Sequence, residues 1–244
     1  DLHSVDRRQR QMCIRDRPTR AWFTGAFEAP TPAQLGAWDA ISSGRHALVI
    51  APTGSGKTLS SFLWALDSFV REPATEGTAA TRVLYVSPLK ALGVDVERNL
   101  RAPLVGITQT AAHQGRPVPR VRVGVRSGDT PAAERRRLQQ DPPDILITTP
   151  ESLYLMLTSQ ARAALTGVRT VIVDEVHAVA GTKRGAHLAV SLERLDALLD
   201  APVQRIGLSA TVEPAAEVAR FLGGTQPVTV VRPASAKRLS LIHI

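Results

Sequence analysis

The chain has 244 residues, of which 43% are hydrophobic, and it carries a formal net charge of +8 and a single cysteine. Such a length can bury a sizeable core, no apolar run approaches the roughly 18 residues that a membrane span needs, and one cysteine excludes a disulfide framework. We therefore expect a globular, cytoplasmic protein without a membrane partner.

The positive charge is concentrated at the two ends of the chain. Residues 1–20 contain six Arg against three acids, and residues 232–244 contain three Lys or Arg and no acid. Residues 21–231 are almost balanced, with 21 Lys or Arg and 19 acids. The net charge therefore says little about binding partners, which must be inferred from motifs.

Both ends resemble translated sequencing-adapter read-through, at VDRRQRQMCIRDR near the start and LSLIHI at the end. We expect residues 1–20 to form an irregular, artefactual leader and residues 233–244 a truncated, artefactual tail. Residues 21–232 are then expected to form one domain, as a piece of a longer protein.

Short apolar runs alternate with helical patterns along the chain. Strands are expected at residues 47–50, 82–87, 121–126, 145–148, 170–174, 204–209 and 228–231. Helices are expected at residues 32–42, 57–71, 90–101, 131–140, 150–159, 185–199 and 214–222. This alternation predicts a three-layer α/β domain whose mostly parallel sheet has helices on both faces and its ligand sites at the carboxyl edge.

A glycine-rich loop, APTGSGKT at residues 51–58, follows the first strand and opens a helix. Gly54 and Gly56 let backbone N–H groups turn toward a polyphosphate, and the helix N-terminus favours an anion. The pattern is that of a phosphate-binding loop, with Ala51 where a glycine is usual. A Gly/Ser turn with an incidental lysine is the weaker alternative. The residues expected to hold the nucleotide are Thr53, Gly54, Ser55, Gly56, Lys57 and Thr58.

Two adjacent carboxylates, Asp174 and Glu175, end the strand at 170–174. Buried carboxylates are costly unless a cation meets them, and the Mg²⁺ of Mg-ATP would do so. We expect Asp174 and Thr58 to hold the metal, Glu175 to polarise the attacking water, and Lys57 to complete the catalytic group. A solvated strand end is the alternative, and the preceding phosphate loop makes it the weaker one.

The glycine-rich loop, the carboxylate pair and a third segment at the end of the strand at 204–209 together resemble a known family. APTGSGKT, DEVH at 174–177 and the triplet Ser209-Ala210-Thr211 resemble motifs I, II and III of superfamily 2 helicases. DEVH in place of DEAD, with WFTGAFEAPTPAQLGAW upstream, TTPESL in the middle and RGAHLAVSLERL after it, resembles the Lhr (large helicase-related) branch. The resemblance covers residues 21–232, the first RecA-like domain of such enzymes.

The resemblance implies an ATP-dependent helicase or translocase that uses ATP and Mg²⁺ and binds a single strand of nucleic acid. It favours 3′-to-5′ movement on DNA or DNA–RNA hybrids and a connection to DNA repair. It also implies a second RecA-like domain, beyond this chain, that supplies arginine fingers. We therefore expect the chain alone to bind ATP weakly and to hydrolyse it barely.

Individual residues take roles from the same resemblance. Gln34 matches the glutamine that reads adenine, and Phe27 would pack over the base, although a lone glutamine on a helix is usually a surface residue. His177, Ser209 and Thr211 would couple the ATP site to domain movement, and the alternative for His177 is a buried core histidine.

Three strand-to-helix turns resemble the strand-contacting motifs of the family, with backbone N–H groups that can meet phosphates. Each turn alone would be an ordinary helix cap, but three on one edge favour a groove that follows the nucleic-acid backbone. The residues are Pro88, Leu89, Lys90, Gly128, Asp129, Thr130, Thr149, Pro150 and Glu151. The basic turn at 181–185 fits either a nucleic-acid contact or a solvated loop.

Two functions of other classes remain open. One is a P-loop ATPase that remodels a partner other than nucleic acid, for which Gln34, the turn at 88–90 and the triplet 209–211 would be coincidental. The other is a non-catalytic nucleotide- or nucleic-acid-binding module. Nucleotide-dependent binding of a single strand separates the first of these from a helicase.

Overall fold

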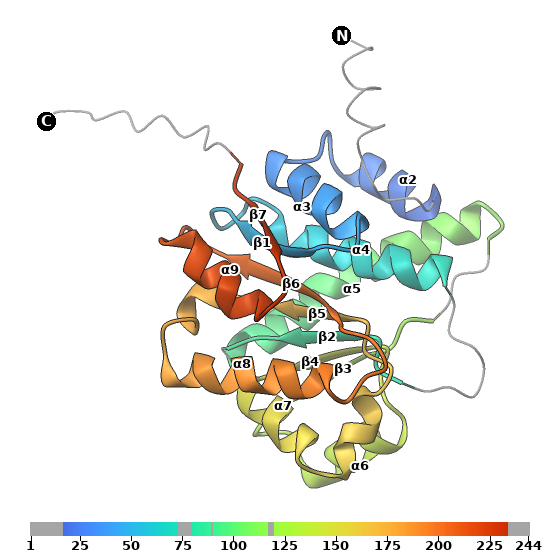
Figure 1. Cartoon of the computed structure of the whole chain (residues 1–244). Coiled ribbons are helices and arrows are strands. Elements are labelled where there is room, and N and C mark those ends of the chain that lie inside the picture. The colour runs from blue at the N-terminus through green and yellow to red at the C-terminus, as the bar shows by residue number, and fades with distance from the viewer. Residues whose placement is uncertain (1–16, 73–79, 89, 117–119, 234–244) are drawn as a thin grey trace, which may run out of the picture.

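The computed structural model describes residues 17–72, 80–88, 90–116 and 120–233 (Figure 1). Its strands are β1 (His46–Ile50), β2 (Val83–Val86), β3 (Val123–Arg126), β4 (Ile145–Thr148), β5 (Thr170–Val173), β6 (Gln204–Ser209) and β7 (Val228–Val231). Its α-helices are α2 (Arg17–Ala26), α3 (Pro32–Ser42), α4 (Lys57–Arg71), α5 (Lys90–His113), α6 (Ala132–Gln140), α7 (Pro150–Leu157), α8 (Lys183–Asp196) and α9 (Ala215–Gly223). Two 3₁₀ turns are η1 (Gln160–Leu165) and η2 (Val176–Ala178).

The strands form one seven-stranded sheet in the order β3-β4-β2-β5-β6-β1-β7. Every pairing between neighbours is parallel. The parallel α/β sheet predicted from the sequence is therefore confirmed. Because all strands point the same way, their carboxyl ends and the segments that follow them lie at one edge of the sheet.

Helices cover both faces of the sheet, as Figure 1 shows. Side chains alternate between the faces along each strand: Val49 and Tyr85 belong to the core beneath α3, α4 and α5, whereas Leu48 and Leu84 belong to the core beneath α7, α8 and α9. Strands buried on both faces explain the nearly continuous apolar runs that the sequence contains.

Helix α3 is fixed to helix α4 at Trp38, whose side chain is fully buried. Its indole Nε1–H donates to the carbonyl oxygen of Ser60 at 3.0 Å, so the large ring is buried without an unpaired polar group. This contact holds the helix that follows the glycine-rich loop against the helix that precedes β1.

Helices α2 and α5 differ most from the sequence-based expectation, while α8 begins two residues and ends three residues before its expected bounds. Helix α2 begins at Arg17, so residues 17–20 of the expected leader are helical, and Pro18 and Thr19 are buried. Helix α5 continues through Pro103 to His113, well beyond the expected end at residue 101. The extension buries Ile107, and α2 packs against α5. Tertiary burial thus outweighs the tendency of proline to end a helix.

Residues 1–16 of the expected leader and 234–244 of the expected tail lie outside the described residues. Within the part of the chain that the structure describes, no helix is both long enough and apolar enough to cross a membrane.

Candidate functional site

The sheet order brings three predicted motifs together at the carboxyl edge. Strand β6 lies between β5 and β1, and Ile50 at the end of β1 is in register with Ser209 at the end of β6. The N–H of Ala51 donates to the carbonyl oxygen of Ser209 at 3.1 Å. The glycine-rich loop and the Asp174-Glu175 pair therefore flank the triplet 209–211.

The glycine-rich loop has the backbone conformation that its sequence predicts. Gly54 and Gly56 have φ of 80° and 79°, a region that residues with a Cβ rarely adopt. Gly56 is the N-cap of α4 and supplies no side-chain cap, so the first N–H groups of the helix remain available. A Cβ on Gly56 would lie 2.4 Å from Nε2 of Gln34. Glycine is therefore required there for both conformation and space.

Two buried polar groups in this loop have no partner among the described residues. The Oγ atom of Ser55 is buried without a hydrogen bond. Lys57 is only 6% exposed, and no carboxylate in the described part of the chain pairs with its ammonium group. A largely buried lysine beside free helix N–H groups favours the binding of an anion there. The loop therefore fits a phosphate group. Thr53 and Gly54 are exposed and Thr58 is half-buried, so all three are accessible at this site.

Gln34 lies against the loop and is already engaged there. Its Oε1 accepts from the N–H of Thr31 at 2.9 Å, and its Nε2 donates to the carbonyl oxygen of Gly56 at 3.4 Å. Thr31 in turn donates from Oγ1 to the carbonyl oxygen of Ser55 at 2.7 Å. Gln34 is 3% exposed, so it is a buried member of a capping box rather than a surface residue.

Phe27 is 41% exposed and stands at the end of a small aromatic cluster. Its ring centroid lies 4.9 Å from that of Phe23 and 6.0 Å from that of Trp22. An exposed ring that neighbours fix in place is able to stack on a planar ligand without losing much conformational freedom.

Asp174 is buried beside a residue that the sequence did not single out, Tyr85 of β2. The Tyr85 hydroxyl donates to Oδ2 of Asp174, and the N–H of Glu175 donates to Oδ1 at 2.9 Å. The Tyr85 ring stacks on Phe62 of α4, with ring centroids 5.1 Å apart. Burial, followed by the neighbouring Asp174 charge, raises the pKa of Tyr85 well above its usual value, so its hydroxyl remains a donor.

Glu175 has φ of 45° and ψ of 44°, a left-handed conformation that is rare for a residue with a side chain. Its Oε2 lies 3.3 Å from Nδ1 of His177. The same Nδ1 lies 3.3 Å from Oγ of Ser209 and 3.3 Å from the N–H nitrogen of Ala210. Contact with Glu175 requires Nδ1 to donate, whereas the Ala210 amide requires it to accept. His177 therefore has two mutually exclusive sets of partners.

The predicted coupling residues are only partly brought together. His177 and Ser209 are in contact, but Thr211 is exposed and has no hydrogen bond among the described residues. Its place is taken by the backbone N–H of Ala210. A backbone donor leaves no trace in the residue type, which is why the sequence did not indicate it.

Two of the turns expected to contact nucleic acid are closed by hydrogen bonds between a side chain and a backbone N–H. The N–H of Ser127 donates to Oγ1 of Thr130 at 2.9 Å, and Gly128 and Asp129 are exposed. Thr149 is the N-cap of α7, as the alternative interpretation of these turns predicts. Thr149 and Pro150 are buried, so neither presents much side-chain surface to a ligand.

The turn after β2 is less accessible than expected, and Glu151 of the turn after β4 is held in an ion pair. Pro88 is buried, and Leu89 and the side chain of Lys90 lie outside the described residues. Glu151 is half exposed and forms a two-point ion pair with Arg184 of α8. The Arg184 guanidinium lowers the pKa of Glu151 to about 2. Arg184 of the basic turn is thus held by a carboxylate in this structure.

No group of three or more His, Cys, Asp or Glu side chains able to hold a metal ion is found among the described residues. The Asp174 carboxylate accepts two hydrogen bonds and retains further lone pairs. Together with the Thr58 hydroxyl it fits a metal ion whose remaining ligands are phosphate oxygens and water, as Mg²⁺ prefers.

The fold and this site define a RecA-like P-loop nucleotide-binding domain. A family model for the DEAD/DEAH box helicase matches residues 31–219. The chain belongs to the DEAD/DEAH box helicase family, and its relatives place it in the Lhr branch, as the motifs predicted.

Two curated relatives are similar over most of the chain. A Lhr helicase and probable uracil glycosylase from Mycolicibacterium smegmatis is 69% identical over 223 residues, which are 91% of this chain and 15% of that protein. A Lhr helicase and uracil glycosylase from Escherichia coli is 61% identical over 220 residues, or 88% of this chain and 14% of that protein. The chain thus spans about one seventh of the length of each relative.

A solved structure supports the same placement. The Mycobacterium smegmatis helicase Lhr bound to single-stranded DNA and AMP-PNP superimposes with a TM-score of 0.87 at 68% identity. The match covers 91% of this chain and 28% of the solved chain. The RecA-like fold is therefore established at high sequence identity.

Proposed function

We propose that this chain is the first RecA-like domain of an ATP-dependent helicase, and that it binds Mg-ATP and one strand of DNA or RNA. The observation that carries the proposal is the convergence of three motifs on β1, β6 and β5, which are neighbours in the sheet. The Lhr helicase solved with single-stranded DNA and AMP-PNP supports the choice of ligands.

The loop and the carboxylate pair divide the chemistry of ATP hydrolysis between them. Lys57 and the N–H groups at the start of α4 hold the phosphates, and Thr58 and Asp174 hold the metal. Bound Mg²⁺ would neutralise charge on the phosphate oxygens. Glu175 orients and polarises the attacking water, while Tyr85 keeps the Asp174 carboxylate in position.

Adenine recognition is assigned to Gln34 and Phe27. Phe27 offers an exposed ring for stacking, and the second N–H of the Gln34 amide and the remaining lone pair of Oε1 are the groups left for the base. His177 couples the Asp174-Glu175 pair to the 209–211 segment, since its Nδ1 lies 3.3 Å from Oε2 of Glu175 and 3.3 Å from the backbone nitrogen of Ala210.

The nucleic-acid strand is assigned to the turns that follow β2, β3 and β4, which are adjacent strands. Contacts there are mainly to backbone N–H groups and exposed positions such as Gly128 and Asp129, so we expect little sequence preference. DNA or a DNA–RNA hybrid, with 3′-to-5′ movement, is the substrate that the Lhr relationship favours.

Nucleotide-dependent strand binding tests the proposal. A fluorescently labelled single strand is titrated with the chain in the presence of Mg²⁺ and millimolar AMP-PNP, ADP or no nucleotide, and anisotropy is measured. We expect the tightest binding with AMP-PNP, loss of that dependence in Lys57→Ala, and retention in Glu175→Gln, which keeps the shape of the side chain.

Two other results would point elsewhere. Tight AMP-PNP binding by calorimetry without strand binding in any nucleotide state would favour a P-loop ATPase with a different partner. Strand binding that ignores nucleotide, Mg²⁺ and the Lys57→Ala change would favour a non-catalytic binding module.

Hydrolysis by the chain alone is expected to be slow. The described residues form a single RecA-like domain, and an arginine finger from a second domain accounts for a factor on the order of 10³ to 10⁵ in rate in related chemistry. A brisk, strand-stimulated ATPase activity of the isolated chain would contradict this expectation.

A further inference from the structure

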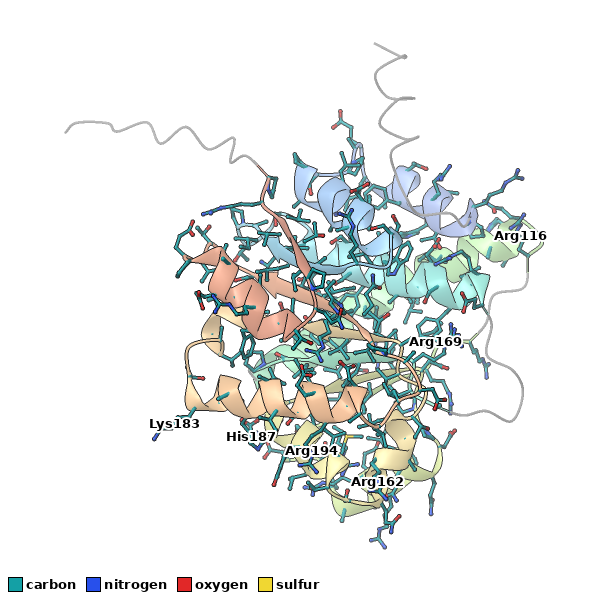
Figure 2. The ribbon with its side chains drawn as sticks, in the orientation of Figure 1. Arg116, Arg162, Arg169, Lys183, His187 and Arg194 are labelled. Atoms are coloured by element: carbon teal, nitrogen blue, oxygen red, sulfur yellow. The ribbon has the colours of Figure 1, made fainter. Side chains whose placement is uncertain are left out.

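The outer surface of helices α7 and α8 carries a row of cationic and aromatic side chains that the proposed site does not use. We call it the α7–α8 face and define it as Tyr154 and Leu155 of α7, Arg162 of η1, and Lys183, His187, Val190 and Arg194 of α8. Figure 2 shows Lys183, His187, Arg194 and Arg162 following one another along the same side of the molecule. Leu155 is 55% and Val190 is 58% exposed.

The face is an ordered surface. The Tyr154 ring lies 4.4 Å from the His187 ring, and the Arg194 guanidinium lies 5.7 Å from the centre of the Tyr154 ring. Lys183 and Arg194 are eleven residues apart on one helix, which corresponds to about 16 Å. The cations are therefore spaced along a line rather than clustered at a point.

The face has an excess of positive charge because the acids nearby are already paired. Glu151 is bound to Arg184, and the two carboxylates of α8 are both bound to the buried Arg205. Lys183, Arg162 and Arg194 have no ion-pair partner in the described part of the chain, and the Arg194 guanidinium lies over the Tyr154 ring. A polyanion is the class of ligand that such a surface fits.

The face is continuous with the edge assigned to the strand. Helix α7 begins at Pro150, directly after the turn that follows β4, and Lys183 is the first residue of the adjacent α8. At the other end lies an open hollow of about 700 Å³ with Arg162 and Arg194 in its wall. Its wall also contains the hydroxyl and amide groups of Thr158, Ser159 and Gln160, which can hydrogen-bond to a nucleotide.

We propose that the α7–α8 face binds the phosphate backbone of the nucleic acid where it leaves the carboxyl edge, so that the protein holds a longer strand than its motifs alone would contact. The inference rests on the proposed function, since it presupposes a strand at that edge. A span of about 16 Å is long enough to meet several consecutive phosphates of the strand.

The test compares strand lengths. The variant Arg162→Ala/Lys183→Ala/Arg194→Ala and the unchanged chain are titrated with a single strand of about 6 and another of about 20 nucleotides, with Mg²⁺ and AMP-PNP, over a range of salt. The matched control removes the same charge from exposed positions of α2, α5 and the turn after α5: Arg20→Ala/Arg101→Ala/Arg116→Ala. Thermal unfolding checks that each variant is folded.

For the long strand we expect the face variant to bind on the order of 10- to 100-fold more weakly and the slope of log affinity against log salt to fall by about 2, or 0.7 per phosphate contact. The short strand and the control variant should change little. Equal losses for both lengths, or equal losses in face and control variants, would overturn the inference and leave the proposed function intact.

Two further results have distinct meanings. If the unchanged chain binds neither strand in any nucleotide state, the proposed function fails and this inference fails with it. If the face variant binds the long strand normally but loses affinity for poly-glutamate of matched charge, the face is a docking surface for an acidic protein segment, which also overturns the inference.

Discussion

The hydrogen bond from Tyr85 to Asp174 can be removed with little change in shape by Tyr85→Phe. Both side chains are buried, Tyr85 completely and Asp174 at 5% exposure, so water cannot easily replace the lost donor. A hydrogen bond to a charged group contributes about 1.5–3 kcal/mol, and leaving a buried carboxylate oxygen without a partner adds to the loss. We expect the free energy of unfolding to fall by about that amount.

Urea and thermal unfolding measure the effect, and the chain contains a matched control. Its only other tyrosine is Tyr154. The Tyr154 ring is half-buried against α8, and its hydroxyl donates no hydrogen bond among the described residues. For a domain of this size a loss of 1 kcal/mol lowers Tm by about 2–4 °C, so Tyr85→Phe should lower it by roughly 3–12 °C. Equal stabilities of Tyr85→Phe and Tyr154→Phe would refute the reasoning.

The same pair gives a pH prediction. In Tyr154→Phe the remaining tyrosinate absorbance reports Tyr85 alone. Its pKa in the folded state lies above the unfolded value of about 10, so the stabilisation by the neutral hydroxyl is complete below that pH and is lost as the pH rises toward the folded pKa. Half-ionisation of Tyr85 near pH 10 in the folded protein would contradict the assigned contact.

Three further predictions concern other contacts. Arg205→Ala should lower the free energy of unfolding by about 3–5 kcal/mol in urea, because Arg205 is 2% exposed and pairs with two carboxylates of α8; a loss below 1 kcal/mol would contradict this. Arg184→Ala should raise the pKa of Glu151 from about 2 toward its ordinary value in a carboxyl NMR titration, and an unchanged pKa would show that the pair is not formed in solution. Glu175→Gly should be about 1 kcal/mol more stable than Glu175→Ala, because glycine relieves the positive φ; equal stabilities would exclude strain.

The sheet and most of its helices could be predicted because the local signals agree with the fold. Helix α4 begins and ends at the residues expected. Its start is clear in the sequence because Gly56 ends the glycine-rich loop directly before Lys57. The gathering of motifs at one edge also follows from the parallel arrangement alone. The order of the strands does not, because the place of β6 between β5 and β1 depends on contacts between residues distant in sequence.

That limit explains why Tyr85 was missed. In the sequence it is one apolar-looking residue of a buried strand, and nothing near it is charged. Only the pairing of β2 with β5, which sets Tyr85 opposite Ile172, brings its hydroxyl to Asp174 two residues further along. A signal existed in principle, since a buried tyrosine needs a partner for its hydroxyl, but the partner could not be named without the register.

Glu175, which we propose to polarise water, is the one described residue other than glycine with a positive φ. A left-handed conformation costs about 1–2 kcal/mol for such a residue, and a glycine at position 175 would avoid it. The conformation directs the Glu175 side chain toward Nδ1 of His177, and the Asp174 carboxylate accepts the Glu175 N–H. Strain of this kind persists only where surrounding contacts fix it, and here they join Tyr85, Asp174, Glu175 and His177 into one connected group. A change in any member should therefore be felt at the others, as the coupling role that we propose for His177 requires.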